Sequence, residues 1–173
     1  VPTTSPTIRS EHAMAYDAAR ARTVMFGGPG DTWEYYGTNW VQVLPATSPP
    51  ASNYQHAMAY DSSRQRIALY GGYATAFVNT VWEFDGTSWI NRISMLAPSE
   101  RHASAMAYHA RRERLILFGG YGDTGRINGF GDAVWAYQDD TWSHGYLASW
   151  PEETCRPGDD ADGDGLFVCE DPD

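Results

Sequence analysis

The sequence contains no lysine, only two cysteines and no long apolar run. An α-helix that crosses a bilayer needs about 18 or more consecutive apolar residues, so no membrane span is expected. All 12 basic side chains are arginines, against 22 acidic side chains. Binding to a phosphate backbone requires a basic stripe. This composition supplies none, and nucleic acid is therefore not expected as a partner.

The acidic charge is concentrated near the C-terminus. The chain has 173 residues and a formal net charge of −10. The segment 152–173 contributes −8 of this charge, from nine acidic residues and one arginine. This imbalance divides the chain into a nearly neutral body, 1–150, and an acidic tail, 151–173. The body is long enough for one domain with a hydrophobic core.

Both cysteines, Cys155 and Cys169, lie in the tail. An isolated pair is better explained by a disulfide in an exported protein than by a redox site. Crosslinking a loop of about 15 residues stabilises a protein by roughly 3 kcal/mol in the chain-entropy model. The chain begins with Val1 rather than Met, which fits removal of a signal peptide, although a trimmed sequence would begin in the same way. We expect a secreted or cell-surface protein.

The body repeats one motif three times. His-Ala-Met-Ala-Tyr-Asp at 12–17 returns at 56–61, and Ser-Ala-Met-Ala-Tyr-His stands at 104–109. Each copy continues into an apolar run, a glycine pair and two Trp residues. These are Gly27-Gly28 with Trp33 and Trp40, Gly71-Gly72 with Trp82 and Trp89, and Gly119-Gly120 with Trp135 and Trp142. A period of 44 to 48 residues predicts one supersecondary unit per copy, which cannot bury its apolar face alone.

Each copy predicts four short antiparallel strands and almost no helix. The first strands are expected at Ala13–Tyr16, Ala57–Tyr60 and Ala105–Tyr108, the second at Thr23–Phe26, Ile67–Tyr70 and Leu115–Phe118, and the third at Thr32–Tyr35, Val81–Phe84 and Val134–Tyr137. A fourth strand starts at the second Trp of each copy. The continuous apolar second strand predicts that both of its faces are covered. Loops of variable length follow the glycine pairs, at Gly28–Asp31, Gly72–Thr80 and Gly120–Asp132.

These residues resemble the kelch repeat in their order and spacing, over roughly Arg9 to Trp142. The resemblance implies an all-β fold of β-propeller blades, at about 9–50, 51–98 and 99–148. The third copy departs from the others at Ser104, where they have histidine. Closed propellers typically have four to eight blades. With three blades the ring is incomplete unless copies of the chain associate.

The tail carries a second motif. The spacing Asp-x-Asp-x-Asp-Gly from position 160 matches the opening of a calcium loop, in which alternate carboxylates converge on one cation. Val168, at the ninth position, cannot ligate through its side chain, which indicates a water or weaker binding. With its flanking cysteines the segment resembles a thrombospondin type 3 repeat or the Asp-rich calcium repeats of exported bacterial proteins. The alternative is a solvated acidic tail with a disulfide. The expected Ca²⁺ ligands are Asp160, Asp162, Asp164 and Asp171 with the backbone carbonyl of Leu166.

Histidine, arginine and tryptophan recur at equivalent positions, and each set could suggest a ligand site. The sets are His12, His56 and His102; Arg20/Arg22, Arg64/Arg66 and Arg112/Arg114; and six of the seven Trp residues. Because each set repeats, a structural role is favoured for all three. The histidines are expected to be structural rather than metal ligands, and the arginines to belong to solvated hairpin turns rather than to an anion-binding patch. The repeated Trp residues are expected to pack in the core rather than to stack on sugars. Trp150, outside the repeats, is the one candidate for sugar stacking.

No motif typical of catalysis is found: the sequence has no Ser-His-Asp order, no Gly-x-Ser-x-Gly and no phosphate loop. Some kelch-type propellers are copper oxidases. The Tyr/His/Cys cluster that would support such an activity cannot be assembled in the propeller, because both cysteines lie in the tail. We expect no catalytic residues and no enzyme.

The sequence therefore predicts an exported, non-catalytic binding or structural scaffold that associates with itself. The two end faces of a three-blade stack, in the copies Arg9–Leu44 and Arg101–Trp142, would be apolar and unpaired. The expected partners are further copies of the chain, as a homo-oligomer or filament, or other extracellular proteins or glycans. The alternative is a carbohydrate- or protein-recognition module that uses the variable loops, which predicts a polar, aromatic pocket at the loop rim.

Overall fold

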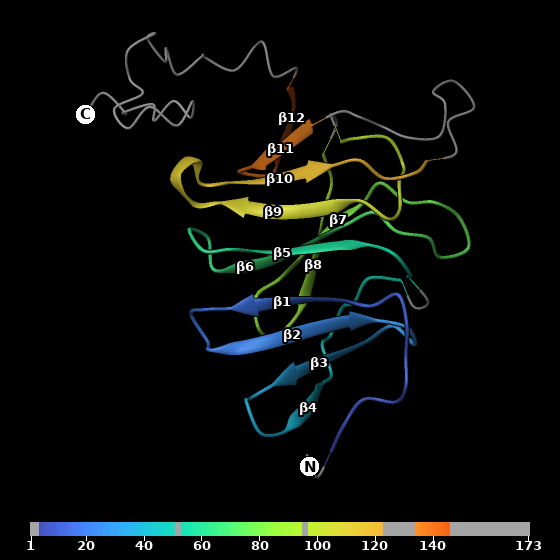
Figure 1. Cartoon of the computed structure of the whole chain (residues 1–173), viewed down its shortest axis with the longest axis vertical. Coiled ribbons are helices and arrows are strands. Elements are labelled where there is room, and N and C mark those ends of the chain that lie inside the picture. Colours follow the sequence, from blue (N-terminus) through green and yellow to red (C-terminus); the bar gives the residue numbers. More distant parts are fainter. Residues whose placement is uncertain (1–3, 51–52, 95–96, 123–133, 146–173) are drawn as a thin grey trace, which may run out of the picture.

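The computed structural model describes residues 4–50, 53–94, 97–122 and 134–145. These residues form twelve strands in three four-stranded antiparallel sheets (Figure 1). They contain no α-helix, only one short 3₁₀ turn, and hence no helix that could cross a membrane. The described sheets do not close into a ring. The predicted all-β fold is confirmed, whereas the predicted boundary between body and tail lies outside the described residues.

The order of strands in each sheet follows the chain, so every strand pairs with its sequence neighbour. The first sheet contains β1 (Ala13–Asp17), β2 (Arg22–Gly27), β3 (Asp31–Tyr35) and β4 (Trp40–Val43). The second contains β5 (Ala57–Asp61), β6 (Arg66–Tyr70), β7 (Val81–Phe84) and β8 (Trp89–Arg92). The third contains β9 (Ala105–His109), the 3₁₀ turn η1 (Ala110–Arg112), β10 (Arg114–Phe118), β11 (Val134–Gln138) and β12 (Thr141–Gly145).

The sheets are consistent with propeller-like blades, and we call them blade 1 (β1–β4), blade 2 (β5–β8) and blade 3 (β9–β12). Figure 1 shows them stacked along the long axis of the molecule, with β5 between β1 and β9. Because side chains alternate across a strand, each blade has two faces. The forward face is directed toward the next blade along the chain, and the rear face toward the preceding one.

The motif Ala-Met-Ala-Tyr is divided between these two faces. In the first strand of each blade the alanines lie on the forward face and Met and Tyr on the rear face, as the pairing registers require. Met58 on the rear face of blade 2 is buried in one core cluster with Val24 and Phe26 of blade 1. Ala57 and Ala59 on its forward face are buried in a second cluster with blade 3. Small residues on one blade therefore accommodate large residues on the next.

The hairpin turns between the first two strands are built as predicted in blades 1 and 2. The Asp17 carboxylate accepts a hydrogen bond from the Arg20 amide at 3.0 Å. The Asp61 carboxylate accepts from the amides of Ser63 and Arg64 at 3.0 and 3.1 Å. Such bonds stabilise a turn because they satisfy backbone donors that the strands leave unpaired. In blade 3 the ring of His109 takes this role for the Arg112 amide, at 3.3 Å.

Candidate functional site

The calcium ligands predicted at Asp160, Asp162, Asp164, Leu166 and Asp171, and the predicted Cys155–Cys169 disulfide, all lie outside the described residues. They stay predictions, as does the assignment of Trp150. Within the part of the chain that the structure describes, no group of three or more His, Cys, Asp or Glu residues is placed to hold a metal ion. The surfaces described below as candidates for function are the blade interfaces, the two end faces and the loop rim.

A buried glutamate occupies the centre of the third strand in blades 1 and 2. Glu34 and Glu83 follow the first Trp of their repeats and lie on the forward faces, almost fully removed from solvent. Burial of a carboxylate is costly unless it is paired and hydrogen-bonded. Glu34 meets this requirement within its own blade, through Arg22 at 2.8 Å, Arg20 at 3.3 Å and the Tyr36 hydroxyl at 3.1 Å.

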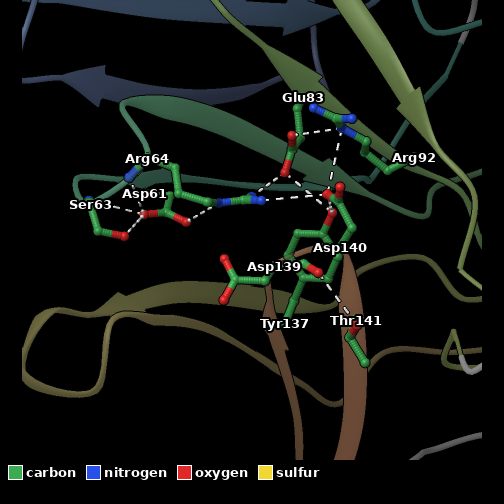
Figure 2. A network of polar contacts seen from close by, with 9 residues as sticks. All are labelled: Asp61, Ser63, Arg64, Glu83, Arg92, Tyr137, Asp139, Asp140 and Thr141. Atoms are coloured by element: carbon green, nitrogen blue, oxygen red, sulfur yellow. Dashed lines mark hydrogen bonds and ion pairs between the residues drawn. The ribbon is translucent and has the colours of Figure 1, made fainter.

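The network around Glu83 reaches across an interface (Figure 2). Within blade 2, Glu83 forms ion pairs with Arg64 and with Arg92, the latter at 2.9 Å. From blade 3, the Tyr137 hydroxyl shares its hydrogen between Glu83 at 3.2 Å and Asp140 of its own blade at 3.0 Å. Asp140 also lies 3.5 Å from Arg64. This cluster therefore fixes the position of blade 3 on blade 2 by directional contacts that apolar packing lacks.

The protonation of the network follows from its charges. Burial alone would lower the pKa of Arg64, but its hydrogen bonds to Asp61 and the charge of Glu83 raise it overall. Burial and the neighbouring Glu83 carboxylate raise the pKa of Tyr137. Arg64 thus stays cationic and Tyr137 stays a neutral hydrogen-bond donor at ordinary pH.

The third repeat lacks both acidic positions of this arrangement. His109 stands where blades 1 and 2 have Asp17 and Asp61, and Ala136 stands in place of the buried glutamate. The forward face of blade 3 consequently has no carboxylate at its centre. Sequence reasoning missed these glutamates, although the recurring Trp-Glu-aromatic triplet in two repeats was a signal for them.

The turn arginines only partly match the expected solvated turns. Arg20, Arg22 and Arg64 are structural, as predicted, but their guanidinium groups extend from the turn to the buried glutamates. Two of them also cover aromatic rings of the next blade, with Arg20 5.2 Å from the ring centre of Phe84 and Arg64 5.4 Å from that of Tyr137. From the turn, each guanidinium group reaches the buried glutamate on the third strand and neutralises its charge. Arg20 and Arg64 thereby also contribute to the interfaces between blades.

The repeated histidines have separate environments. His56 is buried, and its ring lies 5.5 Å from that of Phe26 in blade 1. Burial lowers the pKa of His56 to about 4, so that its imidazole is neutral at pH 7. His102 bonds through Nδ1 to Gln55 at 2.5 Å. These contacts join neighbouring blades, whereas the repetition predicts histidines bonded within their own blades, and the two ring nitrogens of His56 have no hydrogen-bond partner among the described residues.

The tryptophans at the start of the fourth strands belong to the interface cores. Trp89 and Trp142 are buried. The ring of Trp89 lies 5.3 Å from Phe26 of blade 1, and that of Trp142 lies 5.0 Å from Tyr70 of blade 2. Trp89 also donates through Nε1 to Thr32 Oγ1 at 2.9 Å. Both internal interfaces therefore use the same pairing, an aromatic side chain of the second strand on the forward face against a Trp on the rear face.

Among the described sheets, one face of each end blade has no sheet against it. Phe118 on the forward face of blade 3 is 52% exposed, whereas its counterparts Phe26 and Tyr70 are 0% and 1% exposed. On the rear face of blade 1, Met14 and Tyr16 are 45% and 57% exposed, whereas Met25 is 3% exposed. These two open faces are the unpaired end surfaces that the repeat count predicted.

Aromatic side chains gather at the loop rim, the end of the sheets where the glycine pairs lie. The rim cluster consists of Tyr73, Phe77, His102 and Tyr121. Phe77 is stacked on His102 with ring centres 5.0 Å apart, Tyr73 lies 5.2 Å from Phe77, and Tyr121 lies 5.5 Å from His102. Tyr73 and Tyr121 are 43% and 45% exposed, and none of the four rings is part of the two interface cores.

The rim cluster is held by backbone hydrogen bonds. Tyr73 and Tyr54 exchange two such bonds at 2.9 Å, and His102 and Tyr121 exchange two at 2.9 and 2.8 Å. The Gly72 amide donates to the Arg101 carbonyl at 2.8 Å, and a Cβ atom at the adjacent Gly71 would lie 2.3 Å from the same oxygen. Glycine is thus needed here, because only glycine allows the two backbones to approach so closely. The backbone hydrogen bonds hold the loop that carries Tyr73 in a defined position at the rim.

No protein-family model matches the sequence, and no match is found among curated proteins. The architecture therefore rests on the chain's own geometry, which gives three four-stranded antiparallel sheets consistent with propeller-like blades.

Proposed function

We propose that the chain is a non-catalytic, kelch-like propeller segment that acts outside the cell as a structural scaffold and associates with itself. The observation that carries the proposal is the pair of open faces, which repeat the alanines and the aromatic residue of the buried forward faces and the Met and Tyr of the buried rear faces. Removing roughly 400 Å² of apolar surface from water is favourable by on the order of 10 kcal/mol at about 25 cal/mol per Å², and part of this gain offsets the freedom that two chains lose on association. The gain itself is comparable to the stability of a whole domain.

Self-association is tested by sedimentation at low micromolar concentration. We expect species heavier than the 19.2 kDa chain, because isolated open faces leave apolar surface in water. A folded monomer as the single species at that concentration would contradict the proposal, and circular dichroism on the same sample establishes that the chain is folded.

A second part of the proposal concerns calcium binding by the acidic tail. We infer that Asp160, Asp162, Asp164 and Asp171, with the Leu166 carbonyl, hold one Ca²⁺, and that Cys155 and Cys169 close the loop around it. Oxygen donors at this spacing suit calcium, and modular extracellular sites bind it at about 10⁻⁴ to 10⁻³ M. In calorimetry, Asp162→Ala should abolish the calcium heat of the parent chain, whereas Asp173→Ala, outside the ligand set, should retain it. Equal heats from the parent and Asp162→Ala would refute the assignment.

A second candidate function is recognition of a carbohydrate at the loop rim. It is favoured by the rim cluster, because exposed tyrosines on a preorganised loop offer apolar ring faces beside hydrogen-bonding groups. On an array of neutral glycans, Tyr73→Ala and Tyr121→Ala should each weaken binding about fivefold, equivalent to roughly 1 kcal/mol for one stacking contact. Tyr16→Ala is the matched control, since Tyr16 is 57% exposed and lies beside the hairpin turn, at the opposite end of the sheets. Binding that none of these substitutions changes would exclude the rim as the site.

A further inference from the structure

We propose that a second copy of the chain docks head to tail, with the rear face of its blade 1 on the forward face of blade 3, so that Phe118 packs against Trp40 of the second copy. This inference rests on the proposed self-association and adds its polarity and its contact residues.

The first argument is the repetition of one aromatic pair. Phe26 packs on Trp89 between blades 1 and 2, and Tyr70 packs on Trp142 between blades 2 and 3, with ring centres 5.3 and 5.0 Å apart. By strand register, Phe118 is the counterpart of Phe26 and Tyr70 on the second strand of its blade. Trp40, at the start of β4, is the counterpart of Trp89 and Trp142. Among the described residues of one chain, neither Phe118 nor Trp40 has the aromatic partner from a neighbouring blade that its counterparts have.

The receiving surface on blade 1 already has the form of an interface. Trp40 lies 5.1 Å from Tyr35, as Trp89 lies 5.0 Å from Phe84 and Trp142 lies 5.0 Å from Tyr137. Burial of the Trp between blades therefore requires no new arrangement within the sheet. Because the aromatic pair is preformed, little side-chain ordering opposes docking.

The second argument concerns the fit of small residues to large ones. In both internal interfaces the forward-face alanines of one blade meet the rear-face Met and Tyr of the next. The open forward face presents Ala105 and Ala107, both exposed, and the open rear face presents Met14 and Tyr16. Two forward faces together would leave a gap between alanines, and two rear faces would crowd Met and Tyr. Only forward against rear reproduces the packing inside the chain, which makes the contact heterologous.

The third argument is electrostatic. The rear-face Tyr137 donates its hydroxyl hydrogen to the buried Glu83 of the preceding blade, whereas its counterpart Tyr35 bonds to the Gly37 carbonyl of its own blade at 2.6 Å. The open forward face has Ala136 at the glutamate position. The two surfaces therefore match at this position, because Tyr35 directs its hydroxyl to its own blade and covering Ala136 buries no glutamate.

A backbone ladder supports the same polarity. The Gln55 amide donates to the Glu11 carbonyl at 3.1 Å, and the Ala103 amide donates to the Gln55 carbonyl at 2.7 Å. All three residues have the same left-handed backbone, with φ of 58°, 56° and 55°. The next step of the ladder would join the Ala103 carbonyl to the Glu11 amide of the second copy.

The polarity is tested with two interface variants of the full chain. Phe118→Arg blocks the forward face and Tyr16→Arg blocks the rear face, and both positions are more than half exposed. Each variant alone should sediment as a monomer, with association weakened about a hundredfold or more by the buried charge. An equimolar mixture should form a 1:1 dimer and nothing larger, because one pair of intact faces remains. Ile93→Arg, at an exposed position beyond β8, should assemble like the parent.

The outcomes separate this inference from the proposed function. A monomeric parent overturns both. A parent that assembles while Phe118→Arg also assembles, or two folded variants that do not combine in the mixture, overturns the head-to-tail contact and leaves self-association standing. A cooperative thermal unfolding transition and a parent-like circular dichroism spectrum for each variant establish that it is folded; its transition temperature is expected below that of the assembled parent.

Discussion

Glu83→Gln is expected to lower the free energy of unfolding by about 3 kcal/mol or more. The substitution keeps the shape of the side chain but removes the charge that neutralises Arg64 and Arg92. It also weakens the bond from Tyr137, so blade 3 loses a directional contact to blade 2. The loss is large because Glu83 is fully buried, and water cannot replace its charge.

Urea unfolding of the parent and the variant measures this effect. Glu113→Gln is the matched control, since Glu113 is exposed in the turn of blade 3 and the equivalent turn position of blade 2 is naturally Gln65. The control should stay within about 0.5 kcal/mol of the parent. Equal stability of Glu83→Gln and the control would show that the network contributes little to the position of blade 3.

Trp89→Ala is expected to destabilise the chain by about 3–5 kcal/mol, the usual range for a buried Trp replaced by Ala. Trp89 fills the interface between blades 1 and 2, where it contacts Phe26 and Phe84 and donates to Thr32. Its removal leaves a cavity and an unpaired hydroxyl at the same point.

Trp40→Ala provides the comparison, because Trp40 has the equivalent place on a face that no described sheet covers. Its removal should cost clearly less than that of Trp89, and both should be measured in the Phe118→Arg background to keep assembly out of the result. If the two substitutions cost the same, Trp40 is already packed as deeply as Trp89 within one chain, and the rear face of blade 1 is not open.

The sequence predicted the strands well and the polar contacts poorly. The expected second strand Ile67–Tyr70 corresponds to β6, which begins one residue earlier at Arg66, because apolar periodicity and the glycine pair define both ends of a strand. The pairing of Arg64 with Glu83 could not be derived, since 19 residues separate them and only the sheet register places them together. The Trp and the aromatic residue of Val81–Phe84 predict the strand, but they do not predict that the glutamate between them is buried and paired with an arginine.

The composition of the rim cluster could not be predicted from the sequence. The alternative of a recognition module predicts a polar, aromatic pocket at the loop rim; Tyr73 and Tyr121 lie at that end of the sheets, and the pocket stays a prediction. His102, however, was considered as a member of a histidine series. Its stacking on Phe77 depends on where the loop of blade 2 meets the segment before β9, a contact between elements that local sequence patterns do not specify.

The sequential order of strands within each blade has a consequence for synthesis of the chain. A blade can form as soon as its four strands have left the ribosome, because each strand pairs with the one before it. The next repeat follows 44 to 48 residues later, which at about 5–20 residues per second takes roughly 2 to 10 s. During this interval the forward face of the newest blade is exposed to the cell's chaperones. For blade 1 and blade 2 translation itself ends the exposure, whereas the face that carries Phe118 has no later repeat among the described residues to cover it.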